Sequence, residues 1–477
     1  MSSNFFLQNY VADIAVTALF GLGYYLFNSK KQRKLEDKES SKVDSIDIKL
    51  SKCSTLEEYS ALIALEGNLL KNPYILLNSM YKKGISPTID TYNYLLYNCL
   101  KYDQVEEFFQ LKDEVFDPTG PVIPNSYTLC SLIKGTSEKY LKISNSLEGN
   151  SIEEERLLVH SKFDNELKDY ILDLSNRSVP ITIQVHNTII DTLIEHKRIN
   201  EAFLNYENMK TGFKPNLYTY SLLLKGIKNI FSKQNITGDN ENKEEVKFWV
   251  DKGFELINAA EADVEVTLDE NLYNRMLDIC VNLNLISEAE ELFEKIKRKF
   301  EVENSDKVNE FAYSIMIKGY MKLKSIEKCY SIFDDLKLKL KYYKKRTAYP
   351  NSVSYSCMLN ACVKLSKIDL AEYLLEEMTN FGIEKNLYIY TTMINGYKDV
   401  KNHQKAFELY DCIVKDNKFE LNTIFFNSIL DCCVETKKID KMNEILNYMK
   451  SDEHMESEPE IITYSILIKG YAKASNL

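Results

Sequence analysis

Side chains that both donate and accept hydrogen bonds recur along this chain, each directly after an aromatic residue or its equivalent. In the repeated phrases TYN and TYS, the aromatic residue precedes Asn or Ser, and an apolar run follows. An Asn amide offers a donor and an acceptor together, and a hydroxyl group offers both from one atom. The series therefore indicates binding chemistry, in which a polar ligand is held by hydrogen bonds.

The cysteines and histidines do not indicate a metal site. Most of the 10 cysteines stand singly in apolar runs, no Cys-x-x-Cys is present, and there are only 5 His. Cysteines in such runs behave as small buried hydrophobes, and free thiols are typical of a reducing compartment. The His-x-Glu and Pro-Cys-x-x-Cys pattern of zinc deaminases is also absent. We therefore expect no metal, no other cofactor and no enzymatic activity.

The aromatic position belongs to a unit that repeats along the chain. Seven of the nine intervals between successive positions are 34 to 42 residues, and the other two are 57 and 53. A unit near 35 residues with two inserts explains them all. We place the inserts near residues 137–157 and 229–246 and expect both to be exposed loops. The positions are Tyr92, Leu129, His186, Tyr220, Tyr273, Tyr313, Tyr355, Tyr390, Phe426 and Tyr464.

Each unit reads as two amphipathic helices joined by a turn. Apolar residues recur every three or four positions, a spacing typical of helices with one buried face. In the unit 352–386 one such stripe is Met358, Leu359, Cys362 and Val363, and the second is Ala371, Leu374, Leu375 and Met378. We expect hydroxyl groups near the start of each first helix to cap its free backbone N–H groups. These are Thr91, Thr219, Ser354 and Thr463.

The composition supports a helical fold built by stacking these pairs. The chain is 44% hydrophobic, which allows a sizeable core, and its 15 Gly and 9 Pro among 477 residues are too few for a turn-rich all-β protein. One helix pair cannot bury its apolar stripe alone, but stacked neighbours can. The sequence therefore predicts an all-α fold, a right-handed α-solenoid superhelix of about ten to eleven helix-turn-helix repeats of ~35 residues.

The phrases TYN and TYS, the Pro-Asn turn before them and the unit length together resemble the pentatricopeptide-repeat family. Tetratricopeptide repeats have a similar period, but this chain's single Trp and its recurring phrases do not fit their pattern. The resemblance runs from about Thr88 to the end of the chain, with a degenerate unit at 54–88. It implies a protein that binds single-stranded RNA and reads one base per repeat through a few side chains.

The resemblance also implies two base-reading side chains in each unit. The first follows the aromatic position, at Asn93, Asn187, Ser221, Asn274, Ser314, Ser356, Thr391, Asn427 and Ser465, with Cys130 as a departure. The second ends the unit, at Asn125, Asn216, Asp269, Asn309, Asn351, Asn386, Asn422 and Glu460. The alternative is that polar residues in the first turn of a helix only satisfy backbone donors. That alternative does not ask for a second Asn at the far end of the unit.

The pairing of the two positions implies base preferences. Asn with Asn suggests a pyrimidine, Ser or Thr with Asn suggests adenine, and Ser221 with Asp269 suggests guanine. Three consecutive units would then favour an A-rich stretch. Those units carry Ser314/Asn351, Ser356/Asn386 and Thr391/Asn422.

Further residues of the units could hold bases by stacking or contact phosphates. The residue before the capping position is often aromatic or aliphatic and could stack on a base, as at Tyr127, Tyr218, Phe311, Val353, Tyr388 and Ile462. Lysines late in the first helix could meet phosphates, at Lys101, Lys322, Lys364 and Lys473, with a second series at Lys134, Lys225, Lys318 and Lys469. The departures are Asp90 and Asn271 at the stacking position and Asp191, Asp278 and Asp431 in the second lysine series.

The amino-terminal segment 5–28 is apolar, with Gln8, Asn9 and Asp13 as interruptions, and basic residues follow it from Lys30. A stretch of 24 residues can span a bilayer, and basic residues on this flank alone would place the rest of the chain on the cytosolic side. The alternative is a first buried helix of the solenoid. Residues 29–53 read as a polar linker, and 54–477 as the solenoid, which ends inside a unit.

The formal charge of −11 opposes nucleic-acid binding, because contacts with phosphates need Lys and Arg. The main prediction is still a non-catalytic, sequence-selective binder of single-stranded RNA that acts in RNA processing, stability or translation, as a monomer. The alternative is a scaffold that binds protein partners on the same solenoid, with a possible membrane anchor. The sequence leaves the location open between a cytosol-facing membrane of the mitochondrion or endoplasmic reticulum and the mitochondrial interior.

Overall fold

The computed structural model describes residues 50, 53–59, 62, 73–117, 120, 122–146, 152–232, 240–263, 266, 268–301, 309–343, 350–416, 418–450 and 458–475. All regular elements of these residues are helices. The chain forms two compact units, Met1–Pro215 and Asn216–Leu477. The apolar segment 5–28 lies outside the described residues, as does the predicted linker apart from residues 50 and 53. Among the described helices, none has the length and apolarity that crossing a bilayer requires.

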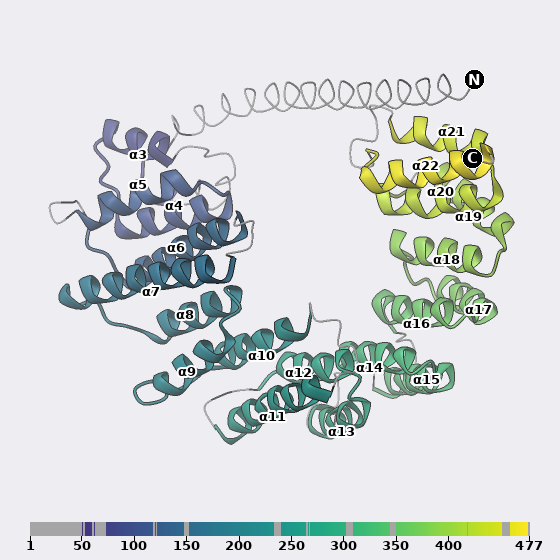
Figure 1. Ribbon diagram of the computed structural model, residues 1–477, viewed down its shortest axis with the longest axis horizontal. Coiled ribbons are helices and arrows are strands. Elements are labelled where there is room, and N and C mark those ends of the chain that lie inside the picture. The colour runs from purple at the N-terminus through teal and green to yellow at the C-terminus, as the bar shows by residue number, and fades with distance from the viewer. Residues whose placement is uncertain are drawn as a thin grey trace, which may run out of the picture. The chain divides into compact units, whose positions relative to one another are not determined.

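The first unit contains three consecutive helix pairs preceded by a single described helix (Figure 1). Its helices are α3 (Pro73–Lys82), α4 (Ile89–Lys101), α5 (Val105–Phe116), α6 (Ser126–Ser146), α7 (Ile152–Asn176), α8 (Ile183–Glu195) and α9 (Ile199–Met209).

The second unit continues the same alternation from α10 to α22. Its helices are α10 (Leu217–Ser232), α11 (Asn240–Ala262), α12 (Glu270–Asn282), α13 (Ile286–Ile296), the π-helical turn η2 (Lys297–Glu301), α14 (Glu310–Lys322), α15 (Ile326–Tyr343), α16 (Ser352–Lys364), α17 (Ile368–Asn380), α18 (Leu387–Asp399), α19 (His403–Asp416), α20 (Thr423–Thr436), α21 (Ile439–Met449) and α22 (Ile461–Ser475).

Each first helix packs against its own partner and against the first helix of the next pair. In the second unit α14 contacts α15 and α16, and α16 in turn contacts α17 and α18. The second helices also contact the following first helix, as α15 does with α16. The predicted α-solenoid of stacked helix pairs is therefore confirmed within each unit.

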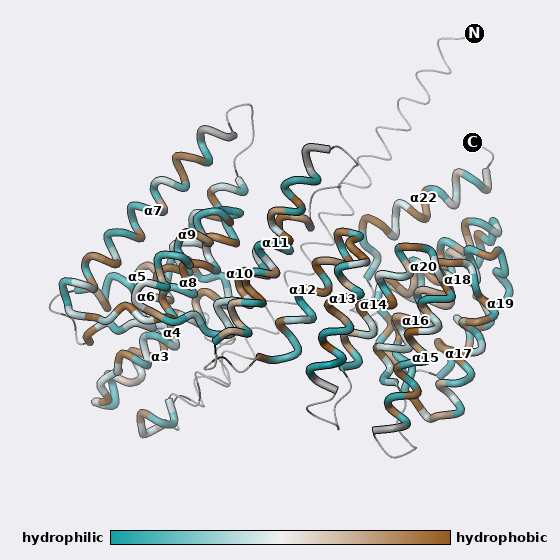
Figure 2. The backbone as a smooth tube through the Cα atoms, turned by 90° about the horizontal axis from the view of Figure 1, so that it is seen from below, coloured by the Kyte–Doolittle hydropathy of each residue, from teal (hydrophilic) through white to brown (hydrophobic). Residues whose placement is uncertain are grey.

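The predicted apolar stripes form the core between the pairs. In α16 and α17, Met358, Leu359, Cys362, Ala371 and Met378 are all fully buried, while Leu375 is half-buried. Figure 2 shows hydrophobic and hydrophilic segments alternating along the helices of each unit. Because the stripe of one pair is covered by the next pair, the core continues from repeat to repeat.

Hydroxyl groups near the helix starts accept from free backbone N–H groups, as we expected at Thr91 and Thr219. They stand at the third residue of the helix and are not its N-cap residue. The capping side chain is three residues earlier, at Thr88 for α4, Asn351 for α16 and the equivalent residue elsewhere. The hydroxyl at the third residue bonds back to the backbone N–H of the capping residue, as at Thr91, Thr128, Thr219 and Thr463. Ser354, the fourth predicted cap, stands at the same third position of α16.

In seven of the described helix pairs, the turn between the two helices carries one residue in the left-handed backbone region. Its φ lies between 55° and 62°, and none of the seven residues is Gly. The left-handed conformation lets the chain reverse within two or three residues, at a steric cost that Gly would avoid. The residues are Asp103, Lys197, Asn284, Lys324, Ser366, Lys401 and Lys437.

The two predicted inserts are not loops over most of their length. The helix α6 continues to Ser146, and α7 begins at Ile152, so the first insert lengthens both helices of one pair. The second insert does the same, because α10 runs to Ser232 and α11 begins at Asn240. Extra turns are favourable here because residues such as Tyr140 remain buried beyond the usual end of the helix.

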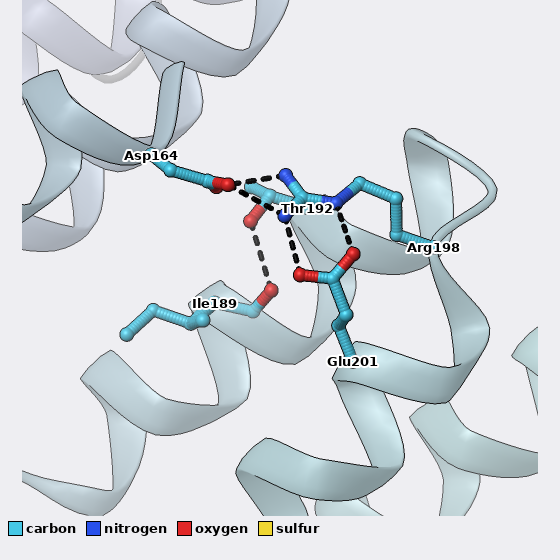
Figure 3. Close-up of polar contacts among 5 residues, drawn as sticks. All are labelled: Asp164, Ile189, Thr192, Arg198 and Glu201. Atoms are coloured by element: carbon cyan, nitrogen blue, oxygen red, sulfur yellow. Dashed lines mark hydrogen bonds and ion pairs between the residues drawn. The ribbon is translucent and has the colours of Figure 1, made fainter. Parts of the chain in front are cut away.

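Polar contacts fix the lengthened α7 to the following pair. The guanidinium group of Arg198, next to α9, donates two hydrogen bonds of 2.8 and 2.7 Å to the two carboxylate oxygens of Asp164 on α7 (Figure 3). It also donates to Glu201, at 2.6 Å from its Nε atom. Arg198 thus links α7 and α9 through a bidentate pair, the arrangement in which Arg binds carboxylates most strongly.

Candidate functional site

A groove of about 960 Å³ lies along the first helices of the second unit. It brings together the starts of α10, α12, α14 and α16, and the side chains that line it include many that the sequence predicted to bind a ligand. These are the first-position residues Ser221, Asn274 and Ser314, the second-position residues Asn216 and Asp269, and the stacking residues Tyr218, Phe311 and Val353.

The second-position residues cap the first helix of the following repeat. The side-chain oxygen of Asn351 accepts a hydrogen bond from the backbone N–H of Ser354 at 2.9 Å, and Asn386 does the same for Ile389 at 3.0 Å. Residues Asn125, Asn216, Asp269, Asn309 and Asn422 accept equivalent bonds at 3.0 to 3.1 Å. The second Asn at the end of a unit therefore has a structural reason that the sequence analysis missed.

At Asn351, Asn386 and Asn422, capping engages the side-chain oxygen and leaves the NH₂ group to donate. An Asp in the same place has no donor and offers only acceptor lone pairs. At Asp269 one carboxylate oxygen accepts from the N–H of Leu272, and the other accepts from Asn271 Nδ2 at 2.9 Å. A capping Asn and a capping Asp thus offer opposite hydrogen-bonding character at the same point of the groove.

The first-position hydroxyl groups are also partly engaged by the helix. Ser356 donates to the carbonyl of Ser352 at 2.7 Å, and Thr391 donates to that of Leu387 at 2.8 Å. Ser314 and Ser465 make the same contact with the carbonyl four residues earlier. Because the hydrogen is used, the oxygen lone pairs are what such a residue can offer to a ligand.

The Asn pairs bond to each other where both members lie in one unit. Asn93 Nδ2 donates to Asn125 Oδ1 at 3.1 Å. Asn274 and Asn309 exchange two bonds, of 3.3 and 3.0 Å. The third pair, Asn187 and Asn216, is divided between the two units. The first two contacts show that the first and second positions of one repeat lie side by side, as the resemblance implied.

The stacking positions carry exposed apolar side chains at the helix starts. Tyr127, Tyr218, Phe311, Val353, Tyr388 and Ile462 are 53 to 63% exposed. Ile424 stands at the same position of α20 and is 68% exposed, but the sequence analysis did not select it. Its place two residues before Phe426 was the signal that could have found it.

The four lysines that we predicted to contact phosphates lie at the far ends of the first helices, and all are exposed. Lys322 donates to the carbonyl oxygens of Val281 and Asn282 at 3.1 and 3.0 Å, so it closes the end of α12. Burial and the positive charge of Lys318 lower the pKa of Lys322. Lys101 lies over the ring of Tyr102, at 5.3 Å from its centroid. Lys364 and Lys473 are exposed at the corresponding ends of α16 and α22.

Two of the acidic departures, Asp278 and Asp431, pair with lysines of neighbouring repeats. Asp278 on α12 lies between Lys228 of α10 at 2.7 Å and Lys318 of α14 at 3.0 Å. Burial alone would raise the pKa of Asp278, but the hydrogen bonds from the two lysines outweigh it and lower the pKa. Asp431 similarly lies 3.6 Å from Lys398 of the preceding first helix. These carboxylates therefore join successive repeats and do not add an uncompensated negative charge to the groove.

The groove in the second unit is not acidic, although the whole chain is. Its lining carries the cations Lys228, Arg275 and Lys318 and the carboxylates Asp269 and Asp278. Arg275 is exposed and follows Asn274 directly, but the sequence analysis did not select it. Since no other unit has a cation directly after the first-position residue, a unit-by-unit alignment could have found it.

Stacked helix pairs with a polar groove along their first helices define an α-solenoid repeat protein. Family models match across both units, as a pentatricopeptide repeat domain at 53–101 and as PPR repeats at 182–229, 350–399 and 421–473. A further repeat model matches at 272–299, 311–339 and 388–417. The chain belongs to the pentatricopeptide-repeat family.

Curated relatives are similar over parts of their length. One chloroplastic pentatricopeptide repeat-containing protein of Arabidopsis thaliana is 22% identical over 307 residues, which cover 56% of this chain and 33% of the relative. A second is 24% identical over 160 residues, covering 34% of this chain and 20% of the relative. The chain thus spans a third or less of the length of these two relatives.

Two solved structures with RNA show weaker likeness. The maize pentatricopeptide repeat protein PPR10, in complex with an 18-nt psaJ RNA element, is 17% identical, with 88% of this chain and 67% of that chain covered and a TM-score of 0.37. Yeast Rmd9p, in complex with a 16-nt target RNA, is 15% identical, with 87% and 75% covered and a TM-score of 0.35. Likeness at this level does not carry function from one chain to another.

Proposed function

We propose that this protein is a non-catalytic, sequence-selective binder of single-stranded RNA that acts in RNA processing, stability or translation. The observation that carries the proposal is the groove of the second unit, in which first-position, second-position and stacking residues from successive repeats line one continuous surface. Membership of the pentatricopeptide-repeat family agrees with it.

The chemistry of the groove fits unpaired bases. Exposed groups such as Tyr218 and Phe311 offer apolar surfaces between which a base can be held without selection, since every base has a π-face. Beside each lies a pair of side chains at the level of one repeat, which can hydrogen-bond one base edge. This division between holding and selecting is how single-stranded RNA is recognised by one-base-per-repeat proteins.

The remaining donors and acceptors support the base preferences. In the repeat of Ser356 and Asn386, the hydroxyl oxygen can accept and the amide NH₂ can donate. An edge with one donor and one acceptor, as in adenine, meets both. Where Asp269 replaces the capping Asn, the carboxylate offers acceptor lone pairs and no donor, which suits the adjacent donors of guanine. We keep adenine for the three repeats of Ser314, Ser356 and Thr391, and guanine for that of Ser221.

A filter-binding series tests the proposal as a whole. The full chain would be assayed at low salt against poly(A), the other homopolymers and single-stranded DNA. We expect retention of RNA, with poly(A) preferred because three consecutive repeats offer an adenine edge. Loss of all RNA retention at low salt would contradict the proposal and would favour the scaffold that binds protein partners, which the net charge of −11 also fits.

A single substitution tests the reading of bases more sharply. Asn386→Asp keeps an oxygen that accepts the N–H of Ile389, so α18 stays capped, but it removes the NH₂ donor. We expect the preferred base of that repeat to change from adenine to guanine, by about 10-fold in relative affinity. Asn402→Asp is the matched control, since Asn402 accepts from the N–H of Lys405 at the start of a second helix. An unchanged preference in Asn386→Asp, with binding intact, would show that the second position does not read bases.

A further inference from the structure

The helix α4, which is the first helix of its pair, carries its exposed aromatic residues at other positions than the first helices of the other pairs. At its second residue, where Tyr127 and Tyr218 stand in α6 and α10, α4 has Asp90. A carboxylate offers no surface for stacking and would repel a phosphate. By the pattern of the other repeats, this repeat would have no residue to stack on a base.

Two tyrosines of α4 offer that surface further along the same helix. Tyr94 and Tyr97 are 48% and 58% exposed, among the largest exposures of any aromatic residue of the first unit. They are three residues apart, so they are neighbours on the helix surface, and Tyr97 is one turn beyond Asn93 on the same side. Among the described residues neither ring nor hydroxyl group has a hydrogen-bond or ring-stacking partner.

The positions that correspond to these tyrosines in the second unit face the groove there. Counted from the first-position residue, Tyr94 corresponds to Arg275 of α12, and Tyr97 corresponds to Asp278 of α12 and Lys318 of α14. All three of those residues line the groove of the second unit. In the first unit, the contact of Asn93 with Asn125 shows that α4 and α6 meet in the same way at this level.

No other repeat has aromatic residues in these two registers. The residues that correspond to Tyr94 are Ser131, Thr188, Leu222, Arg275, Ile315, Cys357, Thr392, Ser428 and Ile466. Those that correspond to Tyr97 are Lys134, Asp191, Lys225, Asp278, Lys318, Asn360, Asn395, Asp431 and Lys469. The aromatic pair is therefore a particular feature of α4 and coincides with the acidic residue at its stacking position.

We propose that Tyr94 and Tyr97 form a base-stacking platform that holds an unpaired nucleobase on α4 of the first unit, in place of the missing platform at residue 90. The proposal rests on the proposed RNA-binding function. The Asn93 and Asn125 amides lie alongside, where they can meet the edge of the same base. Lys101 is exposed and follows Tyr97 by four residues, so a cation stands next to the platform on the phosphate side.

The chemistry favours a nucleic acid over a peptide at this surface. An apolar docking site for a helix needs several adjoining aliphatic side chains, whereas the exposed face of α4 offers two isolated rings between a carboxylate at Asp90 and an ammonium group at Lys101. A base can stack on a ring while its phosphate meets the ammonium group. A peptide partner remains the competing occupant, and the test separates the two.

The test compares RNA affinity in four forms of the full chain. The wild type first selects an oligonucleotide from a random single-stranded RNA pool, and fluorescence anisotropy then measures the affinity of each form for that oligonucleotide. The double variant Tyr94→Ala/Tyr97→Ala should weaken binding about 10-fold or more, because base stacking on an aromatic ring is lost. Tyr94→Phe/Tyr97→Phe should stay within about twofold of the wild type, since stacking needs the ring and not the hydroxyl group.

Tyr373→Ala is the matched control, because Tyr373 is 54% exposed on the second helix α17, away from the first helices. It should leave RNA affinity unchanged. Wild-type affinity in the double Ala variant would overturn the platform while leaving the proposed function intact, and would point to a peptide as the occupant. An equal loss in Tyr373→Ala would also overturn it. If the wild type selects no RNA at all, the proposed function itself fails before the platform is tested.

Discussion

In the second unit the first helices α12, α14, α16 and α18 each have 13 residues, whereas in the first unit α6 has 21 and its partner α7 has 25. Both kinds of pair nevertheless begin in the same way, since Asn125 caps α6 as Asn351 caps α16. The added turns lie at the end of α6 and at the start of α7, which is the end of the pair away from Asn125. Insertions of this kind can therefore enlarge a repeat without displacing the residues that line the groove.

A buried histidine packs against the lengthened pair. His196, at the end of α8, is 7% exposed and lies 3.0 Å from the buried hydroxyl group of Ser137 on α6. Its ring stacks on Phe163 of α7 at a centroid distance of 4.9 Å.

Four predictions test whether the two regions are built in the same way, in order of decreasing effect.

The largest effect is a loss of stability at low pH, which we expect in the α6–α8 region alone. Burial, with the nearby charges of His160 and Arg198, lowers the pKa of His196 from 6.5 to about 4. Between about pH 6.5 and 4 the unfolded chain therefore binds a proton at His196 that the native state does not bind. The free energy of unfolding is highest above about pH 6.5 and falls by up to roughly 3 kcal/mol as the pH is lowered through this range. Hydrogen exchange followed by mass spectrometry would show earlier opening of α6–α8 than of α14–α18.

His196→Gln is the control for this pH dependence, because Gln keeps a polar group near Ser137 but does not titrate in this range. The variant should lose the difference between the two regions on acidification. An equal acid response in α14–α18, which contains no buried histidine among its described residues, would refute the assignment.

The next largest effect is expected at glycines where a first helix packs closely against the preceding pair, a contact that occurs in both regions. The first-helix glycines Gly135 and Gly396 each stand against the preceding pair, and a Cβ atom at Gly396 would lie 2.8 Å from Val363 Cγ2 and 2.9 Å from Ile368 Cδ1. A Cβ at Gly135 would overlap the ring of Phe108. We expect Gly396→Ala and Gly135→Ala each to cost about 2 kcal/mol in urea unfolding. Gly212→Ala, where nothing lies within 4 Å, is the control and should change little.

How far the sequence predicted this structure depends on what fixes each feature. The apolar stripes, the paired helices and the positions of groups such as Asn93 and Phe311 follow from periodicity, and they were predictable. The role of Asn351 as a cap was not, because the end of one unit is also the start of the next helix, and spacing alone assigns the residue to the unit it ends. The inserts were read as loops because polar runs such as GDNENKEE mark turns, whereas burial of Tyr140 favours further helical turns.

A smaller effect should come from removing the caps. Thr88→Ala in the first unit and Asn422→Ala in the second each remove an acceptor for the backbone N–H of the third helical residue. The expected cost is about 1 kcal/mol for each, measured by urea unfolding. Asn422→Asp keeps the acceptor and should restore most of the loss. Equal stability of Asn422→Ala and the wild type would mean that the groove residues do not support the helix starts.

The smallest effect, a gain in stability, is expected when Gly replaces a residue with a left-handed backbone conformation. Ser366 and Lys197 have φ of 56° and 62°, which costs an L-residue roughly 1 kcal/mol that Gly avoids. Gly loses part of that gain through its greater freedom in the unfolded chain. We therefore expect Ser366→Gly and Lys197→Gly each to stabilise by about 0.5 kcal/mol in thermal unfolding. The opposite change, Gly382→Ala at φ 65°, should destabilise.

Under the proposed function the capping residue has two uses, and this restricts how the protein could acquire new base preferences. Only a few side chains, chiefly Asn, Asp, Ser and Thr, start a helix well. A replacement outside that set at Asn351, Asn386 or Asn422 would weaken the start of a helix and at the same time change a side chain proposed to read a base. Larger changes of base preference would therefore have to come from the first-position residue of the same repeat.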